Sequence, residues 1–259
     1  LHAGRLSPTN DLICAQCTRL VVGRVGVYIV IITRCIAIGD GRVYGEHRSV
    51  VNFRALGSES GGVLECEPST KWFPIFVSKL SGATGKVVAV TGCTSGTGFV
   101  CALTCARKGA HVVMLNRSSS RASKAERQIR DLVPDSTVET IECDLASFTS
   151  TRKAADTLIQ KFGAQGVDVL CCNAGVGSSS DLATEDGYGI QMQTNHLSHF
   201  LLTTKCFPLL EMAAKQRGEA RIVNHSSLAR DFPRTLSEKH LGPNGGQLGG
   251  NGNYLIFGP

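Results

Sequence analysis

The chain has 259 residues and a formal net charge of +6, with 42% hydrophobic and 19% charged residues. This composition supplies enough apolar surface for a sizeable core and excludes a disordered, collagen-like or coiled-coil protein. Because residues 1–80 and residues 81–259 each carry a net charge of +3, no basic stripe stands out and we expect no nucleic-acid partner.

Eleven cysteines could form a disulfide framework or stay reduced. Seven of them follow residue 80 inside apolar runs, where small hydrophobic residues are typical, so we expect buried, reduced thiols. This predicts an intracellular protein, cytoplasmic or membrane-associated. Cys14 and Cys17 form a single C-x-x-C without a second pair, and we interpret them as ordinary thiols in preference to a zinc or redox site.

Residues 1–80 show no clean helical or strand period and are treated as an N-terminal extension. The apolar stretch Leu20–Ile38 is broken by Arg24 and Arg34, and a bilayer span needs about 20 uninterrupted apolar residues. A buried strand, or a segment without regular structure, is therefore favoured over a membrane anchor. Trp72–Phe76 is expected to pack against the domain that follows, with a membrane surface as the weaker alternative.

From Lys86 onward, short apolar runs alternate with segments of helical period. Strands are predicted over 86–90, 111–115, 138–143, 167–172 and 221–224. Helices are predicted over 96–108, 120–132, 148–162 and 190–212, the last one containing Pro208. Alternation of this kind predicts an α/β fold, a doubly wound parallel sheet of Rossmann-like type over residues 81–259. Such sheets bind ligands at the carboxyl ends of their strands, where the strand order reverses.

The turn between the first strand and the first helix, Thr91–Gly98, is rich in glycine. Gly92 permits a tight turn, Gly96 permits close approach of a pyrophosphate, and Gly98 permits close packing of the helix on the sheet. The helix N-terminus adds free N–H groups and a partial positive charge. We therefore predict a dinucleotide site whose contacts include Gly92, Thr94, Ser95, Gly96, Thr97 and Gly98.

The residue type at the end of the second strand distinguishes NAD from NADP. An acidic residue there would bond the ribose hydroxyls of NAD, but this chain has Asn116 and Arg117. A guanidinium binds a 2′-phosphate that a carboxylate would repel. We therefore expect NADP, with NAD as the less favoured cofactor and a solvated loop charge as the alternative role of Arg117.

The Thr-Gly-x-x-x-Gly-x-Gly pattern at 91–98 resembles the cofactor motif of the short-chain dehydrogenase/reductase family in its single-domain form. The likeness covers about residues 81–230, and the sequences around Asn195 and Ser227 are most similar to the retinol dehydrogenase-like branch. It implies that Asp144 and Leu145 contact the adenine. It also implies that Asn173, Ala174 and Gly175 lie beside the nicotinamide, with Cys172 replacing the first Asn of the family's Asn-Asn-Ala-Gly.

The resemblance also implies a reaction, in which a hydride passes between nicotinamide C4 and the carbon of a small hydrophobic alcohol or carbonyl, retinoid- or steroid-like. Ser227 would bind the substrate oxygen, while Asn195 would kink its helix and position a water. A Tyr, tuned by a Lys four residues later, would exchange the proton. The family often forms homodimers. We expect no metal, because His196, His199 and His225 lack the spacing of a ligand set.

The Tyr-x-x-x-Lys pair is missing from the expected place. After Ser227 the one tyrosine is Tyr254, and Gly258 stands four residues beyond it. The first methionine is Met114, so we expect a fragment, a processed product or a faulty gene model that stops before the catalytic pair. The hypothesis is an NADP-dependent oxidoreductase without normal turnover in this chain. The alternative is a non-catalytic dinucleotide-binding protein or an inactive truncated product.

Overall fold

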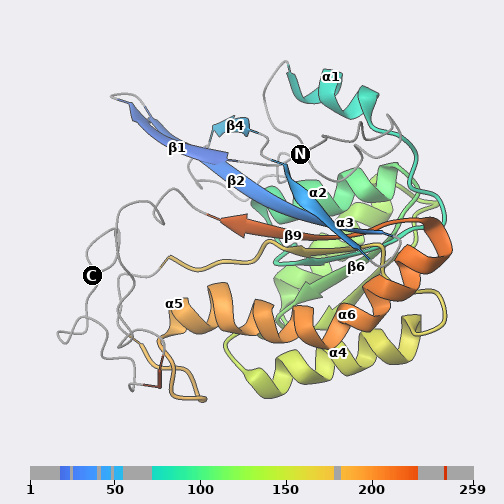
Figure 1. Ribbon diagram of the computed structural model, residues 1–259. Helices are drawn as coiled ribbons and strands as arrows, with labels where there is room; N and C mark the ends of the chain where they lie inside the picture. Colours follow the sequence, from blue (N-terminus) through green and yellow to red (C-terminus); the bar gives the residue numbers. More distant parts are fainter. Residues whose placement is uncertain are drawn as a thin grey trace.

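The structure is a computed structural model that describes residues 18–23, 26–39, 42–47, 50–54, 72–177, 182–226 and 242–243. Its side chains are described from Phe73 onward. Within these ranges the elements alternate between strand and helix from β5 to β9 (Figure 1). The parallel strands are β5 (Val87–Thr91), β6 (His111–Asn116), β7 (Val138–Glu142), β8 (Val169–Cys172) and β9 (Ala220–Ser226).

The helices between them are α2 (Gly96–Arg107), α3 (Ser120–Leu132), α4 (Phe148–Phe162) and α6 (Ser198–Arg217). The predicted bounds of α3 and α4 agree with the structure at both ends. Helix α3 buries Ala122, Ala125 and Ile129 against the sheet, whereas Leu132 at its last position is 43% exposed.

The strand order of the parallel part is β7-β6-β5-β8-β9. The chain therefore leaves β5 toward one edge through β6 and β7, and returns to the other side of β5 through β8 and β9. The order reverses between β5 and β8, and the carboxyl ends of these two strands flank the crevice in which such folds bind ligands. The expected doubly wound α/β sheet is confirmed.

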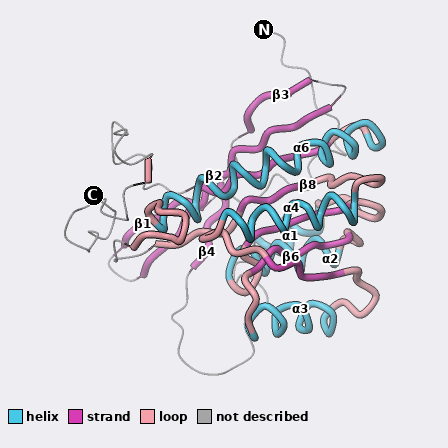
Figure 2. The backbone as a smooth tube through the Cα atoms, turned by 90° about the horizontal axis from the view of Figure 1, so that it is seen from below, coloured by secondary structure: helices cyan, strands magenta, loops and turns pink. Residues whose placement is uncertain are grey.

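Alternate residues of each central strand enter different cores, because successive side chains of a strand point to opposite faces. Val87 and Ala89 pack with α4 and α6, whereas Val88 and Val90 pack with α2 and α3. Figures 1 and 2 show α4 and α6 side by side on one face of the sheet. Both faces are covered, which is why the strands read as continuous apolar runs.

Four further strands come from the N-terminal part: β1 (Thr18–Gly23), β2 (Gly26–Gly39), β3 (Arg42–His47) and β4 (Val50–Arg54). Strand β2 pairs antiparallel with β9, from Ile38 opposite Ala220 to Ile32 opposite Ser226. The described residues of the stretch 20–38 belong to β1 and β2, which agrees with the expectation of strand structure there. Helix α1 (Trp72–Lys79) follows, with Phe73 buried and Ile75 exposed. Within the described residues, no helix is long and apolar enough to cross a bilayer.

The region predicted as one long helix is divided into three parts. A single turn, α5 (Ile190–Met192), leads into a π-helical turn, η2 (Gln193–Leu197), and then into α6. The buried side chain of Gln193 is held at both ends, by the Thr184 hydroxyl and by Asp186 Oδ2 at 2.6 Å. A π-turn carries an extra residue per turn and is frequent at functional sites. Periodicity alone could not reveal it.

Candidate active site

The glycine turn has the shape that close approach of a ligand requires. Gly92 has a φ of +72°, and a Cβ at this position would meet the Cα of Ala174 at 2.8 Å. A Cβ at Gly98 would lie 2.2 Å from the carbonyl oxygen of Gly92. Both positions therefore exclude any side chain, and the backbone of the turn folds directly against the start of α2 and against the segment after β8.

The tip of the turn is open to a ligand. Ser95 and Gly96 are exposed, and Thr94 and Thr97 are partly exposed. Ser95 is the N-cap of α2, yet its hydroxyl makes no capping hydrogen bond within the described part of the chain. The first N–H groups of α2 are thus left to an outside acceptor, which is the arrangement that suits a phosphate.

Thr91 joins the glycine turn to the segment after β8 and to α6. Its buried hydroxyl oxygen accepts the main-chain N–H groups of Asn173 and Ala174, both at 2.9 Å. The same oxygen lies 2.9 Å from Nε2 of His199, whose Nδ1 faces the main-chain oxygen of Asn195 at 3.2 Å. A carbonyl can only accept, so Nδ1 carries the proton and the Thr91 hydroxyl donates to Nε2. Burial lowers the pKa of His199, which favours this neutral form.

Asn116 at the end of β6 supports the turn from the other side. It is 3% exposed, and its Oδ1 accepts the main-chain N–H of Cys93 at 2.7 Å. Its Nδ2 finds no partner within the described residues. Arg117, the next residue, is exposed. Of the three serines that follow, Ser119 is the N-cap of α3 and accepts the N–H of Ala122 at 3.2 Å.

The segment after β7 is fixed by local hydrogen bonds. Asp144 Oδ1 accepts the N–H of Ala146 at 2.9 Å, and the main-chain N–H of Asp144 donates to the Ser150 hydroxyl, also at 2.9 Å. Leu145 is buried, and its carbonyl oxygen accepts the hydroxyl of Ser198 at 2.6 Å. The expected adenine-side residues therefore lie on a turn that is tied to the start of both α4 and α6.

The segment after β8 is held by Asn195. The side chain of Asn195 donates to the main-chain oxygen of Val176 at 2.9 Å and accepts the Val176 N–H at 2.8 Å. Gly175 lies next to this pair, since a Cβ there would be 3.5 Å from Asn195 Oδ1. Cys172, which precedes the segment, is buried and lies 3.7 Å from the Thr203 hydroxyl. The structure thus brings together the residues predicted after β5, after β8 and on the π-turn.

Ser227 and Tyr254 lie outside the described residues. Strand β9 is described as far as Ser226, so the strand that leads into the predicted serine is placed and the serine itself is not. Of the histidines near the site, His196 is exposed, whereas His199 contacts Thr91 and His225 contacts the side chain of Asn173. We did not anticipate these two contacts from the sequence. His199 is a polar residue inside the predicted helix 190–212, whereas His225 lies just beyond the predicted strand 221–224 and carried no local signal.

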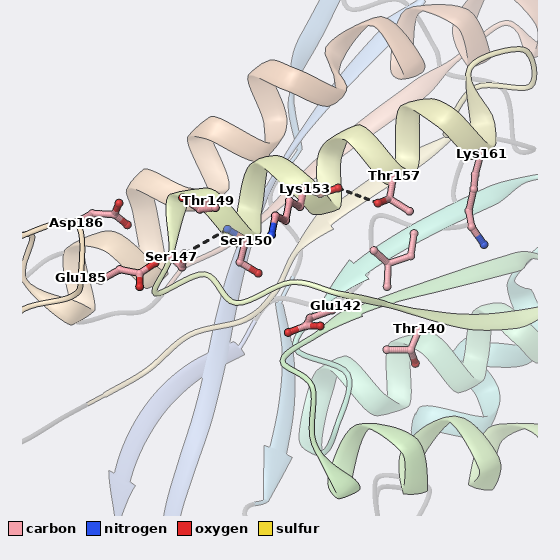
Figure 3. Close-up of a pocket in the computed structure, with 11 residues that line it drawn as sticks. Thr140, Glu142, Ser147, Thr149, Ser150, Lys153, Thr157, Lys161, Glu185 and Asp186 are labelled. Carbon is pink, nitrogen blue, oxygen red and sulfur yellow. Dashed lines mark hydrogen bonds between the residues drawn. The ribbon is translucent and has the colours of Figure 1, made fainter.

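A separate hollow of about 900 Å³ runs along α4 and the edge strand β7 (Figure 3). Figure 3 shows Lys153, Ser150 and Ser147 of the α4 region above it and Thr140 and Glu142 of β7 below. The described residues that line it include none of the predicted cofactor contacts, and Lys161 at its far end is paired with Glu139. This hollow is distinct from the carboxyl ends of β5 and β8, where the predicted cofactor contacts of the glycine turn and of the segment after β8 lie.

A sequence profile described as short chain dehydrogenase matches residues 86–237 of the chain. The chain belongs to the short-chain dehydrogenase family. The matched range contains the glycine turn, the π-turn and the parallel strands from β5 to β9.

Curated relatives of this short-chain dehydrogenase include an uncharacterized oxidoreductase of Schizosaccharomyces pombe, 40% identical over 148 residues, or 56% of this chain and 43% of the relative. Human retinol dehydrogenase 13 is 38% identical over 56% of this chain and 42% of its own length. Human polyprenol dehydrogenase is 33% identical over 72% of this chain and 52% of its own. The chain spans about half the length of these relatives, or less.

Among solved structures, L-sorbose reductase from Gluconobacter frateurii, complexed with NADPH and L-sorbose, is 27% identical to this short-chain dehydrogenase. The match has a TM-score of 0.44 and covers 52% of this chain and 50% of that chain.

Proposed function

We propose that the chain binds a nicotinamide dinucleotide across the carboxyl ends of the parallel strands, with a preference for NADP. The steric cradle at Gly92 and Gly98 and the uncapped N-terminus of α2 support a pyrophosphate site. Membership of the short-chain dehydrogenase family supports the same cofactor class. The adenine would lie toward Asp144 and Leu145, and the nicotinamide toward Asn173, Ala174 and Gly175.

The observation that carries the NADP preference is the exposed guanidinium of Arg117 directly after β6. The position before it is the amide Asn116, which is turned inward to hold Cys93. No carboxylate stands at 116 or 117, so a 2′-phosphate would meet a cation without repulsion.

The test compares dissociation constants for NADPH and NADH in the wild type, Arg117→Ala and Arg121→Ala. Losing a charge-assisted phosphate contact should weaken NADPH binding about tenfold or more in Arg117→Ala and leave NADH unchanged. Arg121 is also exposed but lies within α3, and its removal controls for general electrostatic attraction. Equal affinities of the wild type for the two cofactors would refute the NADP preference.

The proposed reaction is an oxidation or reduction of an alcohol or carbonyl. When bound, the nicotinamide supplies or accepts a hydride. Asn195 fixes the segment after β8 through Val176, and Ser227 is proposed to bind the substrate oxygen. The names of the human relatives, retinol dehydrogenase 13 and polyprenol dehydrogenase, support a hydrophobic alcohol or carbonyl as the substrate class.

A second function, dinucleotide binding without turnover, is favoured by the residues around Tyr254. Gly258 stands where the tuning lysine of the proton-exchanging tyrosine is expected. Incubation of the 259-residue chain with NADPH and a hydrophobic aldehyde distinguishes the two functions. Binding without NADPH consumption supports the second function, whereas consumption that is lost in Tyr254→Phe supports the enzyme.

A further inference from the structure

His225 contacts the amide that joins the segment after β8 to the glycine turn. Its Nδ1 lies 2.8 Å from Oδ1 of Asn173. The Nδ2 of the same Asn173 amide donates to the main-chain oxygens of Thr91 at 2.9 Å and Gly92 at 3.3 Å. Those two acceptors fix which end of the amide is the NH₂ group. Oδ1 is therefore an acceptor, and Nδ1 of His225 must carry the proton.

The imidazole is held in a single neutral tautomer. Its Nε2 is buried and has no hydrogen-bond partner within the described residues; because the single proton of the neutral ring is on Nδ1, Nε2 is the unprotonated nitrogen. Burial lowers the pKa of His225 to about 4, which keeps the ring neutral at physiological pH. A neutral Nδ1–H donor is thus built into the end of β9.

The amide of Asn173 has little room for rotation. A Cβ at Gly98 would lie 2.5 Å from Asn173 Nδ2 and 2.2 Å from the Gly92 oxygen, so these three groups are closely packed. Because β8 and β9 pair as far as Cys172 and Asn224, His225 stands directly beside Asn173 at the carboxyl edge of the sheet. A continuous set of contacts therefore runs from the strand that leads into Ser227, through His225 and Asn173, to the glycine turn.

We propose that His225 is a positioning residue for the cofactor: by donating from Nδ1 to Asn173, it fixes the glycine turn in the conformation that receives the pyrophosphate. The inference rests on the proposed dinucleotide site. His225 touches neither substrate nor cofactor in this role and acts through Asn173. It also links the strand that leads into Ser227 to cofactor binding.

The test uses the full chain with His225→Leu, which removes the donor, and His225→Asn, whose Nδ2 can replace Nδ1. His196→Asn, a change of an exposed histidine on η2, is the matched control. NADPH affinity is measured by fluorescence titration, and the fold is checked by circular dichroism. We expect the dissociation constant to rise about tenfold in His225→Leu, with His225→Asn and the control within about threefold of wild type.

A readout without cofactor separates this inference from the proposed function. Hydrogen exchange of the Asn173 side-chain amide, followed by NMR, should be slow in the wild type and in His225→Asn and fast in His225→Leu. If His225→Leu folds and has the NADPH affinity and the amide exchange rate of the wild type, the inference is overturned. It is also overturned if His225→Leu and His225→Asn weaken NADPH binding to the same extent. If the wild type binds neither NADPH nor NADH, the proposed function and the cofactor role of His225 are both overturned. The exchange of the Asn173 amide then still shows whether His225 holds Asn173.

Discussion

At the scale of single residues, the candidate site contains glycine positions at which the neighbouring atoms leave no space for a side chain. The clearest case is Gly98, where a Cβ would overlap the main-chain oxygen of Gly92 and the amide of Asn173. The first neighbour is a main-chain atom, and the second is held in place by its hydrogen bonds to the main-chain oxygens of Thr91 and Gly92. A Cβ at Gly177, by contrast, would meet no atom within 4 Å in the described part of the chain, and Gly177 does not have a positive φ.

Gly98→Ala should therefore lower the free energy of unfolding by about 2–3 kcal/mol, because the turn or α2 must shift to admit the methyl group. Urea denaturation measures the change, and NADPH titration should show weaker binding in the same variant. Gly177→Ala is the control and should stay near wild type in stability. If Gly98→Ala has the same free energy of unfolding as the wild type, the turn can shift to admit a methyl group without loss of stability.

At the scale of elements, buried polar contacts fix how the strands meet the helices. Asp168 is 2% exposed and stands just before β8. Its Oδ2 accepts the N–H of Val87 at 2.7 Å, and its Oδ1 accepts the N–H at Nε of Arg217 at 2.5 Å. One carboxylate thus joins the starts of β5 and β8 to the end of α6. The more exposed pair of Asp156 and Lys205 joins α4 to α6 at the surface.

We expect Asp168→Asn to destabilise the fold by about 2–4 kcal/mol, since it leaves a partly buried guanidinium without its charge partner. Asp156→Asn should change stability by less than about 0.5 kcal/mol, because an exposed pair is screened by water. Thermal and urea unfolding of the two variants provide the comparison. Similar losses in both would contradict a special role for Asp168.

At the scale of the whole molecule, the sheet has a core on each face, and the free cysteines of the described residues lie in or against these cores. Burial raises the pKa of Cys143, Cys172 and Cys206 to about 12. Cys101 on α2 differs, because it is partly exposed and its pKa is lowered by hydrogen bonds from the thiols of Cys105 and Cys171.

Alkylation of the native protein with iodoacetamide, read by mass spectrometry, should label Cys101 well before Cys143, Cys172 and Cys206. Thiolate is the reactive form, and the buried thiols neither ionise nor meet the reagent. In urea all four should react at similar rates. Fast labelling of the three buried cysteines in the native state would mean that the core on the α4 and α6 face opens readily.

The sequence by itself determined the alternation of strands and helices from β5 to β9, because hydrophobic period, turn residues and capping serines are local properties. It also determined the glycine turn, because glycines at 92 and 98 indicate positions without space for a side chain. The predicted helix 148–162, for example, has the same bounds in the structure, where Ser147 caps it by accepting the N–H of Ser150.

The tertiary structure alone decided what depends on residues far apart in the chain. The contacts of Thr91 with His199 and of His225 with Asn173 join positions 108 and 52 residues apart. The antiparallel pairing of β2 with β9 and the π-turn at Asn195 are likewise fixed by packing partners. A sequence names the groups that can donate and accept, but only the fold brings two of them within hydrogen-bonding distance and removes the water that would otherwise satisfy both.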